Sequence, residues 1–268
     1  MGKITEIKKL KRLYKVCLDG FDETDKIYVC EDTIVHFLLT VEKKLSDTDL
    51  TAVVTFDQFA QGKALAVYFI SFKARTSAEV RRYLQEHEIF DEQANKVLAH
   101  LNEIGLLNDS AYAENFIQGK IALAAAGPYQ IKQKLREKGI SSETIDAAIE
   151  KCYDETAQVE AAIKLAEKTA RSKASRLTLH QLEQKVVQTL TTKGFSYSIA
   201  KTALDSLELE ADEENELDLL YNELDKAARK YARNYEGYDL RNRIIQALAR
   251  KGFDFDEISR ALRNYDFE

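Results

Sequence analysis

The sequence predicts a mainly α-helical protein of tandem three-helix repeats that form an elongated, curved body, preceded by a small β-containing N-terminal lobe. Three observations support this prediction. The 268-residue chain holds a single proline and is 45% hydrophobic and 31% charged, which favours helices around a real core. A phrase with a Lys-Gly pair occurs three times with the same apolar surroundings. The first 45 residues, in contrast, are rich in β-forming residues.

The repeated phrase reads LREKGI at 135–140, TLTTKGF at 189–195 and ALARKGF at 247–253. Lysine followed by glycine suits a helix C-terminus, because the cation complements the helix dipole and glycine adopts left-handed backbone conformations. Positions eight and four residues before each glycine, and one, six, nine and ten after it, are apolar in all three copies. This spacing predicts an apolar stripe on each of two consecutive helices.

A weaker fourth copy lies upstream, where His87-Glu88 replaces Lys-Gly in the same apolar frame. The four anchors are residues 88, 139, 194 and 252, so they lie about 50 to 60 residues apart, a length that fits a unit of three helices. We therefore expect each phrase to mark the turn between the second and third helix of a unit. Modules of this kind contact mainly their neighbours.

The predicted organisation is a lobe at 1–45 followed by units at 46–107, 108–152, 153–208 and 209–268. In the lobe, ITEIKKL, LYKVCL and KIYVC predict strands, and Asp32 or Thr33 is expected to cap a short helix through IVHFLL. Further helices are expected to begin at Asp47 or Asp49, after Ser77 as a cap, at Asp91, at Asp109, at Pro128 and at Ser141 or Ser142. The remaining helices are expected at 155–173, 178–193, 196–207, 212–235, 238–250 and 254–265.

Motifs for catalysis are absent from the sequence. There is no GxxxxGK[ST] phosphate loop, GxGxxG, HExxH or GxSxG, the four histidines are scattered, and the three cysteines form no CxxC. We therefore predict a protein that is not an enzyme and that needs no cofactor and no metal. The sparse cysteines, the lack of a secretory signal and the lack of a long apolar run predict a cytoplasmic protein without a membrane span.

Charge is unevenly distributed along the chain. The net charge of −6 is atypical of a dedicated duplex-DNA binder, which is normally basic. The basic run KKLKR at 8–12 has two interpretations, a solvated strand face or a contact for nucleic acid or an acidic protein.

The candidate partner-binding residues lie mainly on the predicted second helices. Residues one and three positions past an apolar anchor point away from the core, so their charges should face solvent and form a basic stripe along one face of the array. The alternative interpretation is ordinary solvated lysine and arginine. The basic candidates are Arg81, Arg82, Lys132, Lys134, Arg136, Lys138, Lys185, Lys193, Arg241, Arg243, Arg250 and Lys251, and the aromatic candidates are Tyr112 and Tyr129.

Three longer stretches resemble the RecX family of bacterial recombination regulators. They are ALAVYFISFKARTSAEVRRYL, LNEIGLLNDSAYAENFI and GPYQIKQKLREKGISSETIDAAI, which together span about residues 64–150. They hold an alanine-tyrosine helix, an R-x-R-S/T-like turn at Lys73 to Thr76, the phrase from Gly105 to Ala113, and the closing L-x-x-K-G-I. The β-like lobe and the fourth unit resemble the long members of Gram-positive bacteria.

This resemblance implies a function. RecX proteins bind the RecA recombinase, lie in the groove of its filament on single-stranded DNA, and inhibit its recombinase, ATPase and coprotease activities. Such a protein modulates DNA repair and the SOS response, and we expect it to act as a monomer with weak direct DNA binding at most. One departure is Gln118-Gly119-Lys120, where many members place an arginine. The alternatives are a nucleic-acid-binding helical repeat protein and a scaffold for another protein partner.

Overall fold

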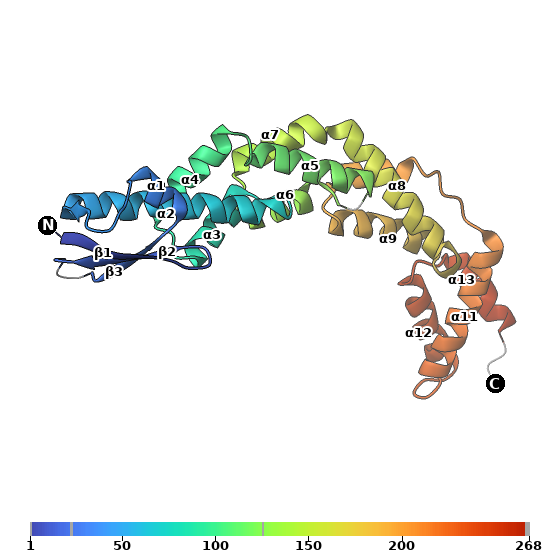
Figure 1. The fold of residues 1–268 in the computed structure, drawn as a ribbon. Helices are drawn as coiled ribbons and strands as arrows, with labels where there is room; N and C mark the ends of the chain where they lie inside the picture. Colours follow the sequence, from blue (N-terminus) through green and yellow to red (C-terminus); the bar gives the residue numbers. More distant parts are fainter. Residues whose placement is uncertain (1, 22–23, 125, 266–268) are drawn as a thin grey trace. The chain divides into compact units, whose positions relative to one another are not determined.

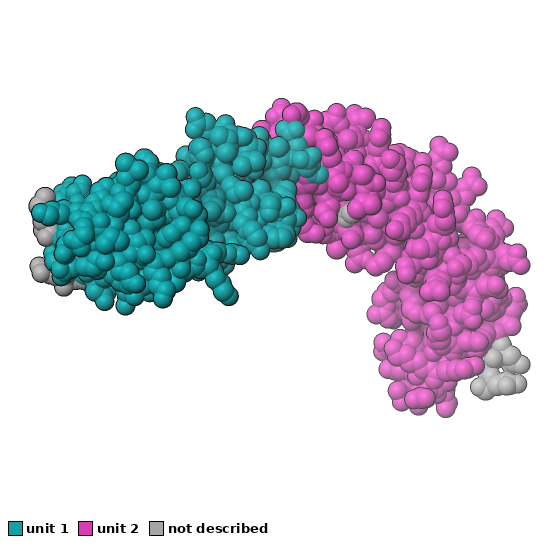
Figure 2. Space-filling view, in the orientation of Figure 1, with its two compact units in different colours: residues 1–115, 135–145 teal, residues 116–134, 146–268 magenta. Residues whose placement is uncertain are grey.

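The computed structural model describes residues 2–21, 24–124 and 126–265 (Figure 1). The described chain separates into two compact units, residues 1–115 with 135–145 and residues 116–134 with 146–268 (Figure 2). The strands are β1 (Gly2–Lys9), β2 (Tyr14–Asp19), β3 (Lys26–Val29) and β4 (Lys44–Leu45). The helices are α1 (Glu31–His36), α2 (Asp47–Ser71), α3 (Ser77–Glu86), α4 (Asp91–Glu103), α5 (Asp109–Ala122), α6 (Pro128–Glu137), α7 (Ser142–Cys152), α8 (Glu155–Lys173), α9 (Leu179–Thr192), α10 (Tyr197–Asp205), α11 (Glu213–Tyr231), α12 (Gly237–Ala249) and α13 (Phe255–Asn264).

The N-terminal lobe is an antiparallel sheet with the strand order β3-β2-β1-β4. Successive strand residues point to opposite faces, so Ile4, Val16 and Val29 line the inner face and pack with Val53 of α2. A register shift between Ile4 and Glu6 keeps the apolar residues of β1 on this face. The sheet lies along α2 in Figure 1. The small β-containing lobe that the sequence predicts is therefore confirmed.

A buried carboxylate joins the lobe to α2. Asp57 is 4% exposed and its Oδ1 accepts hydrogen bonds from the Cys30 backbone N–H and the Thr33 hydroxyl, both at 2.7 Å. Its other oxygen accepts a bond from Gln61. The predicted caps of α1 are wrong, because that helix begins after Cys30 and Thr33 is bonded inside the helix to Asp57.

The helix starts follow the capping residues of the sequence with one shift. A capping box between Ser46 and Asp49 begins α2, and a second one between Thr76 and Glu79 begins α3. Thr76, and not Ser77, therefore caps α3. The starts at Asp91, Asp109 and Pro128 and the helix at 155–173 are confirmed, and the later helices lie within a few residues of their predicted bounds.

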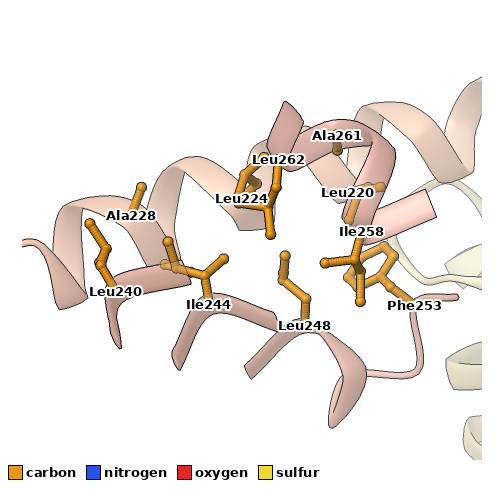
Figure 3. Close-up of a cluster of buried hydrophobic side chains, with 11 residues drawn as sticks. Leu220, Leu224, Ala228, Leu240, Ile244, Leu248, Phe253, Ile258, Ala261 and Leu262 are labelled. Carbon is orange, nitrogen blue, oxygen red and sulfur yellow. The ribbon is translucent and has the colours of Figure 1, made fainter. Parts of the chain in front are cut away.

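The apolar frame of the repeated phrase forms the core. The residues four positions before each anchor, Leu84, Leu135, Leu190 and Leu248, are all buried. The other five frame positions are buried in every copy as well. Figure 3 shows how Ile244, Leu248 and Phe253 meet Leu220, Leu224 and Ile258 among α11, α12 and α13. Tandem three-helix organisation is thus confirmed.

The four anchors share one backbone turn. Residues Glu88, Gly139, Gly194 and Gly252 have φ values of 59°, 77°, 91° and 88°. After each anchor, the next N–H donates to the carbonyl of the buried leucine, as in Ile140 to Leu135 at 3.2 Å and Phe195 to Leu190 at 3.1 Å. The anchor N–H donates to the residue after that leucine, as in Gly139 to Arg136 at 2.8 Å. These are Schellman turns, which satisfy carbonyls that a helix end leaves without partners.

Candidate partner-binding surface

The Lys-Gly turn is also a joint between second helices. The Thr76 hydroxyl at the start of α3 donates to the Lys138 carbonyl at the end of α6, at 2.7 Å. A Cβ on Gly139 would collide with the Cβ of Ala78. The N-terminus of α3 therefore meets the C-terminal turn of α6, with opposite ends of two helix dipoles facing each other.

The same joint occurs twice more. The Gly127 and Tyr129 N–H groups at the start of α6 donate to the Lys193 and Gly194 carbonyls, at 2.7 and 3.1 Å. The Gln181 side chain at the start of α9 donates to the Lys251 carbonyl at 2.6 Å. Backbone N–H groups that a helix N-terminus leaves without partners make the second joint, whereas side-chain donors near the helix start make the first and the third. Each joint thus connects the start of one second helix to the end of the next by hydrogen bonds.

One joint contains an ion pair. Lys138 Nζ lies 2.6 Å from Glu79 Oε1, and the side chains are 38% and 18% exposed. Burial alone would raise the pKa of Glu79, but the hydrogen bonds from Lys138 and from the Thr76 N–H outweigh it and lower that pKa. The hydrogen bond to Glu79 raises the pKa of Lys138. Glu79 and Lys138 therefore stabilise each other in their charged forms.

Several predicted basic candidates are occupied by contacts within the protein. Lys132 pairs with Asp146 at 2.6 Å, and Lys251 pairs with Glu223. Lys185 donates to Gln188, Arg250 Nε donates to the Gln246 carbonyl, and the Arg243 guanidinium lies over the Tyr235 ring at 5.0 Å. Lys138 is also occupied, because it pairs with Glu79 in a joint. These side chains are therefore less available for a partner than the sequence alone indicates.

Four other candidates keep their charges available. Arg82, Lys134, Arg136 and Lys193 are exposed, and none forms an ion pair with a residue that the structure describes. Arg81 is half-buried beside Arg82, and Arg241 is exposed on α12. We use the name second-helix cations for Arg82, Lys134, Arg136 and Lys193.

The two aromatic candidates differ in exposure. Tyr129 is 71% exposed on the first turn of α6, so its ring can meet a partner. Tyr112 is half-buried on α5, so less of its ring is open to a partner.

Sequence reasoning missed a stack of flat side chains on α2 and α3. The Arg75 guanidinium lies 3.9 Å from the Phe69 ring centroid, and Phe69 stacks on Tyr83 at 4.1 Å with nearly parallel planes. The His87 ring lies beside Tyr83, with centroids 4.2 Å apart and planes tilted by 45°. Arg75 Nε is buried and forms no hydrogen bond within the described chain. The spacing from Phe69 to Tyr83 crosses a turn, so helical periodicity could not reveal this contact.

The described residues hold no group of three or more histidine, cysteine or acidic side chains that could bind a metal ion. Within the same residues, no helix combines the length and the apolarity that crossing a membrane requires.

Three family models together match most of the helical part of the chain. The first, second and third three-helix domains of RecX match residues 63–101, residues 108–149, and residues 156–204 together with 213–262. A "Regulatory protein RecX" of Lactococcus lactis subsp. cremoris (strain SK11) is 60% identical over all of this chain and 99% of its own. This chain belongs to the RecX family.

Further relatives agree with this assignment. A protein with the same description from Streptococcus gordonii is 45% identical over 98% of this chain and 99% of its own. A crystal structure of regulatory protein RecX matches 76% of this chain and 100% of that chain, with a TM-score of 0.60 and 32% identity. A RecX structure from Lactobacillus salivarius matches 57% of this chain and 99% of that chain, with a TM-score of 0.54. RecX relatives are thus named as regulatory proteins, which supports a regulatory role for this chain.

Proposed function

We propose that this protein binds the RecA recombinase and its filament on single-stranded DNA and inhibits RecA, thereby modulating DNA repair and the SOS response. The observation that carries the proposal is the match to RecX regulatory proteins along the full chain. We propose that the protein acts in the cytoplasm without enzymatic activity of its own, and that residues 46–107, 108–152, 153–208 and 209–268 are its four helical units. The shared Schellman turns at 88, 139, 194 and 252 support this division.

The second-helix cations are the proposed contact residues. They are solvent-exposed charges on helices whose ends are held by backbone hydrogen bonds. The backbone therefore loses little conformational freedom when these residues bind a partner. Exposed cations attract acidic protein surfaces and phosphates, and this attraction weakens as salt screens it. Tyr129, which extends from the same helix as Lys134, adds an aromatic contact.

The decisive experiment measures the ATPase activity of RecA on single-stranded DNA with increasing amounts of this protein. The parent should inhibit, and it should hydrolyse no nucleotide when RecA is omitted. The variant Arg82→Glu, Lys134→Glu, Arg136→Glu, Lys193→Glu should inhibit at least tenfold less well, because the lost contacts need to sum to only about 1.4 kcal/mol. Cosedimentation with RecA filaments should weaken in parallel.

A control reverses two exposed charges on a first helix. Lys226→Glu with Lys230→Glu on α11 should inhibit like the parent. Circular dichroism should show unchanged helicity in both variants. Full inhibition by the quadruple variant would place the contact elsewhere, and a parent that leaves RecA unaffected would refute the proposed function.

A further inference from the structure

The outer face of the N-terminal sheet carries a row of three side chains that form no ion pair with a described residue. Lys8 of β1 lies directly opposite Lys15 of β2, and Lys15 lies opposite Tyr28 of β3. Their neighbours in each strand, Ile7, Val16 and Ile27, belong to the inner core, so the row points away from it. We call Lys8, Lys15 and Tyr28 the outer row.

In the described part of the chain, no carboxylate pairs with the lysines of this row, and Glu6 on the same face accepts a hydrogen bond from Cys17. Neither Lys8 nor Lys15 forms an ion pair there, in contrast to Lys9 on the inner face, which lies 3.7 Å from Glu31 and over the Tyr14 ring. Lys11 and Arg12 in the adjoining hairpin connection are exposed and form no ion pair with any residue that the structure describes. Like charges opposite each other in a sheet destabilise it. An anion bound across the row would offset the repulsion between Lys8 and Lys15.

The sequence concentrates positive charge here in an acidic protein. Residues 7–18 carry five lysine and arginine side chains and no acidic one, while the whole chain has a net charge of −6. A patch of this kind attracts a polyanion locally although the chain as a whole repels it.

Tyr28 indicates which polyanion fits. Its side chain is 47% exposed at the end of the row, on the edge strand of the sheet. An exposed ring beside lysines can stack on a base while the lysines contact phosphates. Duplex DNA hides its base faces, and an acidic polypeptide offers no flat ring system to stack on. Single-stranded nucleic acid satisfies both kinds of side chain.

We propose that the outer row, with Lys11 and Arg12, is a binding surface for single-stranded nucleic acid. Phosphates would lie along Lys8, Lys15 and the hairpin connection, and a base would stack on Tyr28. This surface is separate from the second-helix cations and gives the lobe a function of its own.

The test uses the full chain without RecA, so its outcome does not depend on the proposed function. Fluorescence anisotropy measures binding of a labelled oligodeoxythymidylate at several salt concentrations. Lys8→Glu with Lys15→Glu should weaken binding tenfold or more. The slope of log K against log salt should become shallower by about 1.4, since each phosphate contact to a single strand contributes about 0.7.

Two further variants separate binding from folding and stacking from charge. Lys8→Glu alone places opposite charges across the strands, so it should leave the melting temperature unchanged or raise it while still weakening binding. Tyr28→Ala should weaken binding about fivefold or more at every salt concentration without changing the slope, and Tyr28→Phe should bind like the parent.

The control is Lys226→Glu with Lys230→Glu, which makes the same change in net charge on α11 and should bind like the parent. The proposal is overturned if the parent does not bind the oligonucleotide, or if the double variant of the row binds as tightly as the parent. Equal binding of a duplex with no effect of Tyr28→Ala would overturn the assignment to single strands. Displacement of the oligonucleotide by polyglutamate of equal charge would assign the surface to an acidic protein instead.

Discussion

The turn after α3 and the turn after α6 have the same backbone conformation but different sequences. Both are Schellman turns, yet Glu88 occupies the first and Gly139 the second. The difference lies in what each turn meets: Gly139 packs against Ala78 of α3, whereas Glu88 is exposed. A left-handed conformation alone is thus tolerated by glutamate, and the close approach of another helix is what excludes a Cβ.

This contrast explains the repeated Lys-Gly pair. Gly139, Gly194 and Gly252 each meet the N-terminus of the preceding second helix, at Ala78, Gln130 and His180. The residue before each glycine supplies a carbonyl that accepts a hydrogen bond in the joint. The turn after α3 has no preceding second helix, because the lobe and α2 come before it in the chain. Glycine is therefore not required at this turn.

The largest expected effect on stability comes from adding a side chain to the glycine of a joint. A Cβ on Gly194 would lie 2.7 Å from the Gln130 backbone N, and φ is 91°. Gly194→Ala should lower the free energy of unfolding by about 2–4 kcal/mol, since backbone strain and overpacking add. The urea midpoint, followed by circular dichroism, measures this loss. A midpoint within error of the parent would show that the joint is not tightly packed in solution.

A smaller effect is expected from the ion pair in the first joint. Because the folded-state pKa of Glu79 is lowered, its stabilising contribution is present above its ordinary pKa of 4.5 and is lost as pH falls through the lower folded pKa. Glu79→Gln should therefore cost about 1 kcal/mol at pH 7, a value limited by the partial exposure of Lys138.

The pH dependence sharpens this prediction. Urea midpoints of the parent and of Glu79→Gln should differ at pH 7 and converge as the pH falls below 4.5 and Glu79 becomes protonated. The raised pKa of Lys138 adds a second limit, because its contribution is present below 10.5 and is lost as pH rises through the folded value. A constant difference from pH 7 down to the acid limit would rule out the ion pair as its cause.

The smallest effect is expected at the turn that lacks a joint. Glu88→Gly removes the backbone strain of a non-glycine residue at a φ of 59°. Because Glu88 is exposed, the change disturbs no packed helix. It should stabilise the protein by up to about 1 kcal/mol. Thermal unfolding of this variant beside Gly194→Ala compares a turn without a joint with a turn inside one. A clear loss of stability in Glu88→Gly would mean that the Glu88 side chain makes stabilising contacts of its own.

The candidate site was only partly predictable. Apolar spacing placed Arg82, Lys134, Arg136 and Lys193 on the outside of their helices correctly, because burial follows helical periodicity. It could not show that Lys132 and Lys138 pair with Asp146 and Glu79, since those carboxylates belong to other helices. The stack of Arg75, Phe69 and Tyr83 was missed for the same reason.

By itself, the sequence determined the helices, their apolar faces and the positions of the four turns. Capping residues, helical periodicity and glycine act over a few residues, so their signals are local and can be read without a structure. Tertiary structure alone decided that Gly139 meets Ala78, that Asp57 joins the lobe to α2, and that Lys8 faces Lys15 across the sheet. Each of these contacts joins residues that are distant in the chain or on separate elements, and only packing brings them together.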